Sequence, residues 1–485
     1  MEMPFSTRRG GQTSNHKQAP AIRTHTMNRR DFLKWTGSAA AAARLGGLPQ
    51  AQAATAPSGR TAQGKKPNII FILADDYGIG GLSCYGSDRF KTPNLDALAQ
   101  GGIRFEYCFA MPLCAPSRGV CMTGRYPFRT GVVDNGAGSA ARPDKEVCIA
   151  RVMKQAGYAT AVAGKWRQLQ YFSTKEDGQR WGFDEFVVWG VEGNKGERYW
   201  DPVYNKNGEQ IPDTQGKYGP DLLHEFVVDF IRRHRNEPFF VYYPIPLIHG
   251  PILRTPDTPA GGTELYADNI TYLDKLIGKL VAELDSLKLR EKTLIVFTGD
   301  NGCTPQASGA KGNGGGAIRG RAIDGAKGSM KEGGSRVPLI VSWKGSTPAG
   351  QVSKDLVDFS DFFATFAELA GAKLPEGVTI DGRSLAPQIT GRKGTPREWV
   401  FVQLGNQWYV RDARWKLNNQ GQLFDMKDAP FEETPIQPDS TEPQAQAARA
   451  KLQAALDQLR PQDAAAAPPK GQKKPRKRVG KKKKQ

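Results

Sequence analysis

The stretch Ile69-Ile70-Phe71-Ile72-Leu73 is a continuous apolar run, and the carboxylates Asp75 and Asp76 follow it. A short run without polar alternation is typical of a strand buried on both faces of a parallel sheet. Further runs of this kind lie at residues 159–163, 239–243, 293–298 and 339–343. Segments with the apolar spacing of helices lie between them, at 93–99, 222–231 and 270–284. Strands that alternate with helices predict an α/β fold with a large, mostly parallel sheet.

The last part of the chain has a different pattern. Short apolar stretches between polar turns indicate strands at 399–403, 408–411, 415–418 and 422–424. A segment rich in Ala, Leu and Gln predicts a helix over 443–459. We therefore expect a large domain over residues 67–395 and a small α+β subdomain over 396–460, with an antiparallel sheet and one helix.

The formal charge of +19 is concentrated at the two ends of the chain. Residues 470–485 contain ten Lys or Arg and no acid, and residues 1–66 contain eleven against two acids, so residues 67–469 are neutral. A lysine-rich end that contains proline and glycine is typical of a disordered segment, and we assign 461–485 as a basic tail. Contact of the tail with acidic polymers or membranes stays open, but the neutral body gives no reason to expect nucleic-acid binding.

The first 53 residues have the features of an export signal. Arg29 and Arg30 precede Phe32 and Leu33, an alanine-rich run covers 36–48, and an Ala-x-Ala cleavage site ends the segment. The paired arginines resemble a twin-arginine signal, whose partner is the twin-arginine export machinery. The apolar run is too short for a stable membrane span. We therefore expect a leader over 1–53, a linker over 54–66, and a mature protein in the periplasm of a bacterium or outside the cell.

Six cysteines are present, and their spacing matches no zinc-binding pattern. If Cys114 is catalytic, five remain, so they cannot all form disulfides. We expect most of the others to be buried thiols; they are Cys84, Cys108, Cys121, Cys148 and Cys303.

Oxygen-bearing side chains follow two of the predicted strands. Asp75 and Asp76 come after the strand at 69–73, and Asp300 and Asn301 come after the strand at 293–298. Asp-Asn-Gly alone is an ordinary turn signal. The carboxyl ends of parallel strands, however, share the edge of the sheet where ligands bind. Two such pairs together predict a site for a hard cation such as calcium or magnesium.

A further stretch, from Pro112 to Arg125, contains Cys114 and Arg118. Pro116 and Ser117 suit the first turn of a helix, which would place Cys114 just outside its N-terminus and Arg118 one turn further on. A helix N-terminus and a guanidinium both favour negative charge beside the sulfur position. An isolated cysteine would more simply be structural.

Two lysines and one histidine also stand next to predicted strands or glycine-rich turns. Lys165 follows the strand at 159–163, Lys327 lies in Ala326-Lys327-Gly328-Ser329, and His249 follows the strand at 239–243. A single lysine is usually a solvated surface charge. His224 and His234 lie in or beside a helix, and we expect them to be structural.

The pattern Cys114-x-Pro116-Ser117-Arg118, followed by Thr123-Gly124-Arg125, closely resembles the signature of the type I sulfatases of the alkaline phosphatase superfamily. The resemblance covers about residues 67–430 and implies the alkaline-phosphatase-like fold. In that family a maturation enzyme oxidises the cysteine to formylglycine, and its hydrated aldehyde is the nucleophile. The equivalent residues ligate a metal, Ca²⁺ or Mg²⁺; here they are Asp75, Asp76, Asp300, Asn301 and the modified Cys114.

The resemblance also implies roles for the cations. Lys165 and Lys327 bind the sulfate, Arg118 and the metal polarise the formylglycine, and His249 contacts the sulfate or the leaving oxygen. One hydroxyl of the formylglycine attacks sulfur, and His249 or Lys327 protonates the departing alcohol. The second hydroxyl then expels sulfate and restores the aldehyde.

Arg167 departs from the family pattern, which has histidine after Gly-Lys-Trp. Arginine cannot act as a base near neutral pH, but it can orient the formylglycine hydroxyl or bind a more anionic substrate. The sequence therefore predicts an exported sulfatase that acts on a sulfated carbohydrate, a polysaccharide or an aryl sulfate. The alternatives are a phosphoester or phosphonate monoester hydrolase of the same superfamily, and a non-catalytic binder of sulfated polymers.

Overall fold

The computed structural model describes residues 66–138, 141–166, 169–171, 173–189, 197–304 and 316–465. The expected leader, nearly all of the linker, Arg167 and the chain beyond residue 465 lie outside these ranges. None of the helices within these ranges combines the length and the hydrophobicity that a membrane span requires.

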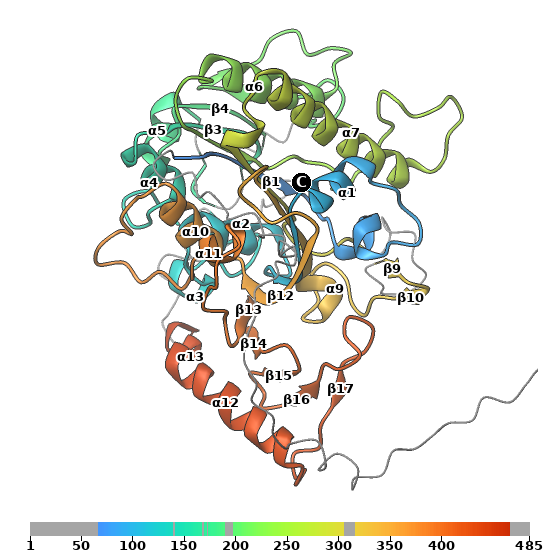
Figure 1. Ribbon diagram of the computed structural model, residues 1–485, viewed down its shortest axis with the longest axis vertical. Coiled ribbons are helices and arrows are strands. Elements are labelled where there is room, and N and C mark those ends of the chain that lie inside the picture. Colours follow the sequence, from blue (N-terminus) through green and yellow to red (C-terminus); the bar gives the residue numbers. More distant parts are fainter. Residues whose placement is uncertain are drawn as a thin grey trace, which may run out of the picture. The chain divides into compact units, whose positions relative to one another are not determined.

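A ten-stranded sheet forms the centre of the large domain (Figure 1), in the order β12-β2-β11-β8-β1-β7-β3-β4-β5-β6. β1 pairs in parallel with β7 and β8, whereas β11 is antiparallel to β8 and β2. The sheet is therefore mixed but mostly parallel at its centre, as predicted. Its strands are β1 (Asn68–Ala74), β2 (Ile103–Phe109), β3 (Ala159–Lys165), β4 (Glu185–Trp189), β5 (Asn205–Lys206), β6 (Glu209–Gln210), β7 (Phe239–Tyr243), β8 (Thr293–Gly299), β11 (Arg336–Ser342) and β12 (Gln351–Asp358).

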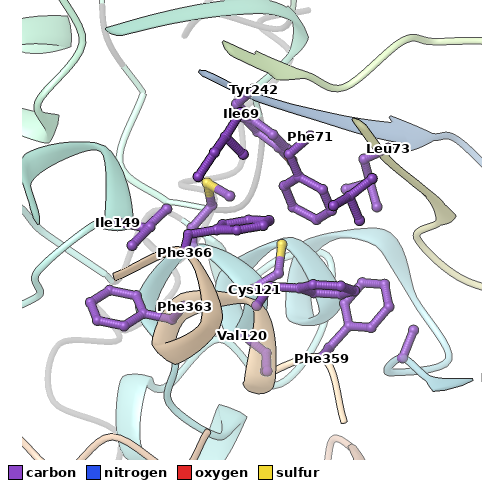
Figure 2. Close-up of a cluster of buried hydrophobic side chains, with 14 of the residues drawn as sticks. Ile69, Phe71, Leu73, Val120, Cys121, Ile149, Tyr242, Phe359, Phe363 and Phe366 are labelled. Atoms are coloured by element: carbon purple, nitrogen blue, oxygen red, sulfur yellow. The ribbon is translucent and has the colours of Figure 1, made fainter. Parts of the chain in front are cut away.

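Helices cover both faces of this sheet, because alternate residues of β1 enter two different hydrophobic clusters. Ile69, Phe71 and Leu73 pack with α2, α4 and α10, as Figure 2 shows around Cys121 and Phe366. The intervening residues of β1 pack with α1, α6 and α7 on the opposite face. The helices of the large domain are α1 (Pro93–Gln100), α2 (Cys114–Thr123), α3 (Pro127–Thr130), α4 (Ile149–Gln155), α5 (Lys175–Trp181), α6 (Gly219–Arg233), α7 (Leu265–Ser286), α9 (Glu332–Ser335), α10 (Asp361–Leu369) and α11 (Ala386–Ile389).

The C-terminal part forms a separate five-stranded antiparallel sheet against one long helix. The strands follow one another in chain order and are β13 (Val400–Leu404), β14 (Gln407–Arg411), β15 (Trp415–Asn418), β16 (Leu423–Asp425) and β17 (Thr434–Pro435). Helix α12 (Pro443–Leu459) packs its apolar side on this sheet, and Leu452 and Leu456 share a hydrophobic cluster with Leu417 of β15. Residues 461–465, which we expected to begin the tail, form the short helix α13 (Pro461–Ala465).

Candidate active site

The pairing of β1 with β8 places the two oxygen-bearing pairs side by side. Ala74 lies opposite Gly299 in the parallel register, so the residues that follow each strand meet at one edge of the sheet. Asp75, Asp76, Asp300 and Asn301 are all at most 2% exposed. The backbone N–H of Asp76 donates to Asp300 Oδ1 at 2.9 Å, and Asn301 Nδ2 donates to Asp76 Oδ1 at 2.9 Å. The structure therefore brings together all four predicted oxygen donors.

Cys114 lies against this group, although its helix begins earlier than expected. Cys114 is the first residue of α2 rather than a residue outside it, and Leu113 is at the N-cap position without a side-chain cap. Ser117 does not cap the helix, because its hydroxyl donates to the carbonyls of Met111 and Leu113. The Cys114 sulfur lies 3.8 Å from Asp76 Oδ1.

Burial dominates the chemistry of the unmodified thiol. It raises the pKa of Cys114 to about 12, and nearby Lys165 only partly opposes this effect. The helix N-terminus and Arg118 favour negative charge at this position, but they do not offset the burial of the thiol. Arg118 lies one turn on, but its guanidinium binds Asp300, with Nε and Nη2 at 2.8 and 2.7 Å from Oδ2.

Two ammonium groups complete the charge balance. Lys165 Nζ lies 2.8 and 2.7 Å from the two oxygens of Asp75, and Lys327 Nζ lies 2.6 and 2.7 Å from those of Asp76. Burial alone would raise the pKa of Asp75, but Lys165 and the other nearby cations hold it well below its usual value. For Asp300 burial prevails and raises the pKa to about 6.

Lys327 reaches the site because its loop is fixed to two neighbouring loops. Its backbone N–H donates to the carbonyl of Cys303 at 3.0 Å, and that of Gly328 donates to the carbonyl of Pro112 at 2.8 Å. The loops after β8 and before α2 therefore hold the lysine in place.

His249 enters from the loop after β7. The backbone N–H of Asp75 donates to Leu247, and that of Ile248 donates back to Asp75, both at 2.9 Å. These bonds place His249 Nε2 3.8 Å from Asp76 Oδ2. Asp75 favours the protonated imidazole, but burial and Lys165 oppose it, and the pKa of His249 falls below its usual value.

Two residues that the sequence did not indicate also belong to this region. Asn135 Oδ1 accepts the backbone N–H of Ala115 at 3.0 Å and so satisfies the first turn of α2 from a distant loop. Arg198 Nη2 lies 2.9 Å from His249 Nδ1. Asn135 stands in Asp-Asn-Gly, an ordinary turn pattern, and Arg198 has no motif around it, so only the fold reveals either contact.

The donor set fits a hard divalent cation. Four possible ligand atoms lie within 4.8 Å of one another, one each from Asp75, Asp76, Cys114 and His249. Asn301 Oδ1 is buried and has no hydrogen-bond partner among the described residues. A buried oxygen without a donor is costly, and a metal ion would satisfy it.

The two other histidines of the described chain have the surroundings of structural residues. Burial lowers the pKa of His224 on α6 to about 4, and His234 Nδ1 lies 2.7 Å from Glu237. All six cysteines are free thiols, and five are buried, with Cys84 half-buried. Arg167, the position that departs from the motif, is outside the described residues.

Comparison with known proteins gives a consistent result. Residues 67–372 match the family model described as Sulfatase, and residues 26–46 match the twin-arginine translocation signal. The chain is 30% identical over 451 residues to human arylsulfatase D, covering 75% of each chain. It is 32% identical over 368 residues to N-acetylgalactosamine-6-sulfatase of Canis lupus familiaris, covering 70% of this chain and 69% of that protein.

Solved structures show the same fold. Ps i-CgsB in complex with k-i-k-neocarrahexaose superposes with a TM-score of 0.70 and 27% identity, covering 81% of this chain and 93% of that one. A phosphonate monoester hydrolase from Silicibacter pomeroyi shares the fold, with a TM-score of 0.60 and 18% identity over 82% of this chain and 95% of that one. The chain belongs to the sulfatase family of the alkaline phosphatase superfamily, the sulfuric ester hydrolases.

Proposed function

We propose that this sulfatase acts on a sulfated carbohydrate or an aryl sulfate at the site around Cys114. The observation that carries the proposal is the position of Cys114 at the head of α2. There it is enclosed by Asp75, Asp76 and Asp300, and by the cations that pair with them. N-acetylgalactosamine-6-sulfatase and the carrahexaose complex of Ps i-CgsB are relatives with a sugar in their names, which supports a carbohydrate substrate.

The site is electrically balanced before it binds an ion. The carboxylates Asp75, Asp76 and Asp300 are matched by Arg118, Lys165 and Lys327. A divalent cation, Ca²⁺ or Mg²⁺, held by Asp75, Asp76, Asp300 and Asn301 would make the site positive. When bound, it supplies electrostatic stabilisation of negative charge on the reacting oxygens. A positive, buried site is suited to an anionic sulfate ester.

The environment of Cys114 favours modification over a thiolate nucleophile. A thiol with a pKa of about 12 is almost entirely neutral near pH 7, and neutral thiols are poor nucleophiles. Formylglycine at this position supplies a hydroxyl nucleophile that needs no thiolate. We therefore propose a formylglycine-generating enzyme as a partner of this protein in its host.

The chain's own residues bind and orient the ester. Lys165 and Lys327 each present a buried or largely buried ammonium group, and both bind sulfate oxygens. Arg118 is fully buried and fixes Asp300 and Asp75, with its Nη2 3.5 Å from Asp75 Oδ1. His249 or Lys327 provides the proton that the departing alcohol takes up.

The proposal is tested with protein from a host that contains a maturation enzyme. Mass spectrometry of the peptide with residue 114 should show the aldehyde, and an aryl sulfate should be hydrolysed faster than the matching phosphate or phosphonate ester. A faster phosphate or phosphonate reaction would favour the alternative hydrolase. An unmodified thiol without turnover would favour a binder of sulfated polymers.

Two further parts of the proposal depend on sequence alone. The twin-arginine match supports export to the periplasm or beyond, which cell fractionation tests. Arg167 stands where the family has histidine, and we propose that it binds a second anionic group of the substrate. Arg167→His should then raise KM for a highly sulfated oligosaccharide and leave KM for a simple aryl sulfate unchanged.

A further inference from the structure

Arg198 differs from the other cations of the site, since it binds a histidine instead of a carboxylate. Arg118, Lys165 and Lys327 each pair with an aspartate, whereas Arg198 has no acidic partner in the described part of the chain. Its Nη2 lies 2.9 Å from His249 Nδ1. The guanidinium also lies over the rings of Trp189 and Tyr199, at 4.6 and 5.3 Å from their centroids.

The segment that carries Arg198 is fixed to the His249 loop. The Tyr199 hydroxyl contacts the carbonyls of Pro246 and His249, at 2.9 and 2.5 Å. The Tyr204 hydroxyl donates to the carbonyl of Arg198 at 2.6 Å. Gly219 packs so closely that a Cβ there would lie 2.2 Å from the same carbonyl. Arg198 and His249 are therefore held in a defined geometry.

The chemistry of the two side chains sets the position of one proton. A guanidinium has five N–H donors and no acceptor, so Nδ1 of His249 must accept the hydrogen bond. A neutral imidazole that accepts at Nδ1 carries its proton on Nε2. Nε2 is the nitrogen that faces Asp76 and the site of the reaction, at 3.8 Å from Asp76 Oδ2.

A second group competes for the same nitrogen. The carbonyl oxygen of Gly250 lies 2.7 Å from Nδ1 and can only accept, so it favours the opposite tautomer. That arrangement would leave Nε2 with a lone pair, which a metal-bound histidine requires. A hydrogen bond with a charged donor is roughly twice as strong as a neutral one, so the contact with Arg198 prevails.

We propose that Arg198 is a positioning residue that keeps the proton of neutral His249 on Nε2. His249 then donates a hydrogen bond to an oxygen of the sulfate ester and is not a ligand of the metal. A ring held in this form does not give up its proton, so of the two candidates Lys327 remains as the proton source. The inference rests on the proposed function for the role of His249, but the tautomer itself is independent of it.

The tautomer is measured directly on the full chain with unmodified Cys114. The chain contains five histidines, so ¹⁵N-histidine labelling gives a simple spectrum, and His249→Gln identifies the signal. At a pH where the ring is neutral, we expect a protonated Nε2 and an unprotonated Nδ1. In Arg198→Met the proton should move to Nδ1, where Gly250 accepts it. A protonated Nδ1 in the wild type, or loss of the Nε2 proton on addition of calcium, would overturn the inference.

A double-mutant cycle tests the consequence for turnover. Arg198→Met should lower kcat on a sulfated sugar by about ten-fold, the usual size of a lost orienting contact. In the background of His249→Gln, which keeps a donor but has no tautomers, the same change should have little further effect. Arg198→Lys keeps a donor and should restore part of the rate, and Arg232→Met on the outer side of α6 is the matched control.

The two possible failures are distinguishable. If His249→Ala leaves turnover unchanged, the proposed role of His249 is wrong, whatever its tautomer. If His249→Ala lowers turnover but the effects of Arg198→Met and His249→Gln are simply additive, Arg198 acts independently and only the present inference fails. Far-ultraviolet circular dichroism shows whether Arg198→Met is folded. If it is not, Arg198→Gln replaces it in both experiments.

Discussion

The molecule contains two buried clusters of charge, and they differ in whether they are complete. The first surrounds Asp75, Asp76 and Asp300 at the carboxyl edge of the main sheet. The second joins the main domain to the C-terminal sheet and contains Glu332, Arg336, Arg411, Lys416 and Glu433. Both clusters pair every acid with at least one base, yet only the first leaves an oxygen, Asn301 Oδ1, without a partner among the described residues.

The second cluster is satisfied by its own residues. Glu332 contacts both Arg411 and Arg336, and its backbone N–H donates to Glu433 at 3.1 Å. Lys416 Nζ donates to Glu433 at 2.6 Å and to the carbonyl of Met330 at 2.7 Å. The comparison indicates that a buried charged cluster is structural where every group has a partner. A buried oxygen that lacks a hydrogen-bond donor, next to several carboxylates, instead marks a place for a ligand.

The largest expected effect comes from removing Cys114 itself. Cys114→Ala should lower kcat/KM on an aryl sulfate by more than about 10⁴-fold, because the nucleophile is lost. The melting temperature should change little, since the thiol has no strong partner beyond the 3.8 Å contact with Asp76. The matched control is Cys121→Ala on the same helix, which faces the hydrophobic cluster and should lower stability while retaining turnover. Wild-type turnover in Cys114→Ala would remove Cys114 from the mechanism.

The second cluster should respond in the opposite way, with a loss of stability and not of chemistry. Arg411 is fully buried, so Arg411→Met leaves Glu332 short of a partner and should cost about 3–5 kcal/mol of unfolding free energy. Chemical denaturation measures this. Arg414→Met, in the turn between β14 and β15, removes a partly exposed pair with Asp425 and should cost at most about 1 kcal/mol. Equal losses of unfolding free energy in the two variants would show that the buried cluster stabilises the fold no more than an exposed ion pair does.

How much of this could be foreseen depends on how local each signal is. The apolar run of β1 and the carboxylates behind it are adjacent in the chain, so both the strand and the position of Asp75 were predictable. β12 was missed because it is an edge strand whose first five residues are exposed or half-exposed and mostly polar. β2 and α10 were also missed, and the antiparallel direction of β11 depends on pairing that the sequence does not encode locally.

The site shows the same division. The strand ends that carry Asp75 and Asp300 were expected to meet, because parallel strands share an edge. The start of α2 was wrongly predicted from local rules, since Cys114 is its first residue. The raised pKa of Cys114 follows from burial by distant parts of the fold, which no local pattern indicates. Arg198 approaches His249 across 51 positions of sequence, and no spacing rule connects them.

Removal of divalent cation should affect only the first cluster. Chelation should abolish turnover and lower the melting temperature, because Asn301 Oδ1 is again unsatisfied. Calcium at 100 times its dissociation constant should restore about 2.7 kcal/mol by mass action. Asp75→Asn should reduce this gain in stability. Arg411→Met should instead lower the stability by the same amount with and without calcium, so that the gain from calcium is unchanged. Full activity in a chelated sample would reject the metal site.

The smallest expected effect is the contribution of Asp300 to the pH dependence of stability without metal. Burial raises its pKa in the folded protein to about 6, from an ordinary value of 3.8. Between these values the folded state binds more protons at this group than the unfolded state does, so the group makes stability fall as pH rises through the window. Asp300→Asn removes this falling contribution, so the stability of the variant relative to that of the wild type should increase between about pH 4 and pH 6 in chelated samples. Denaturation across that range measures it, with the exposed Asp213→Asn as control. Parallel curves for wild type and Asp300→Asn would mean that Arg118, 2.7 Å away, keeps Asp300 ionised even without a cation.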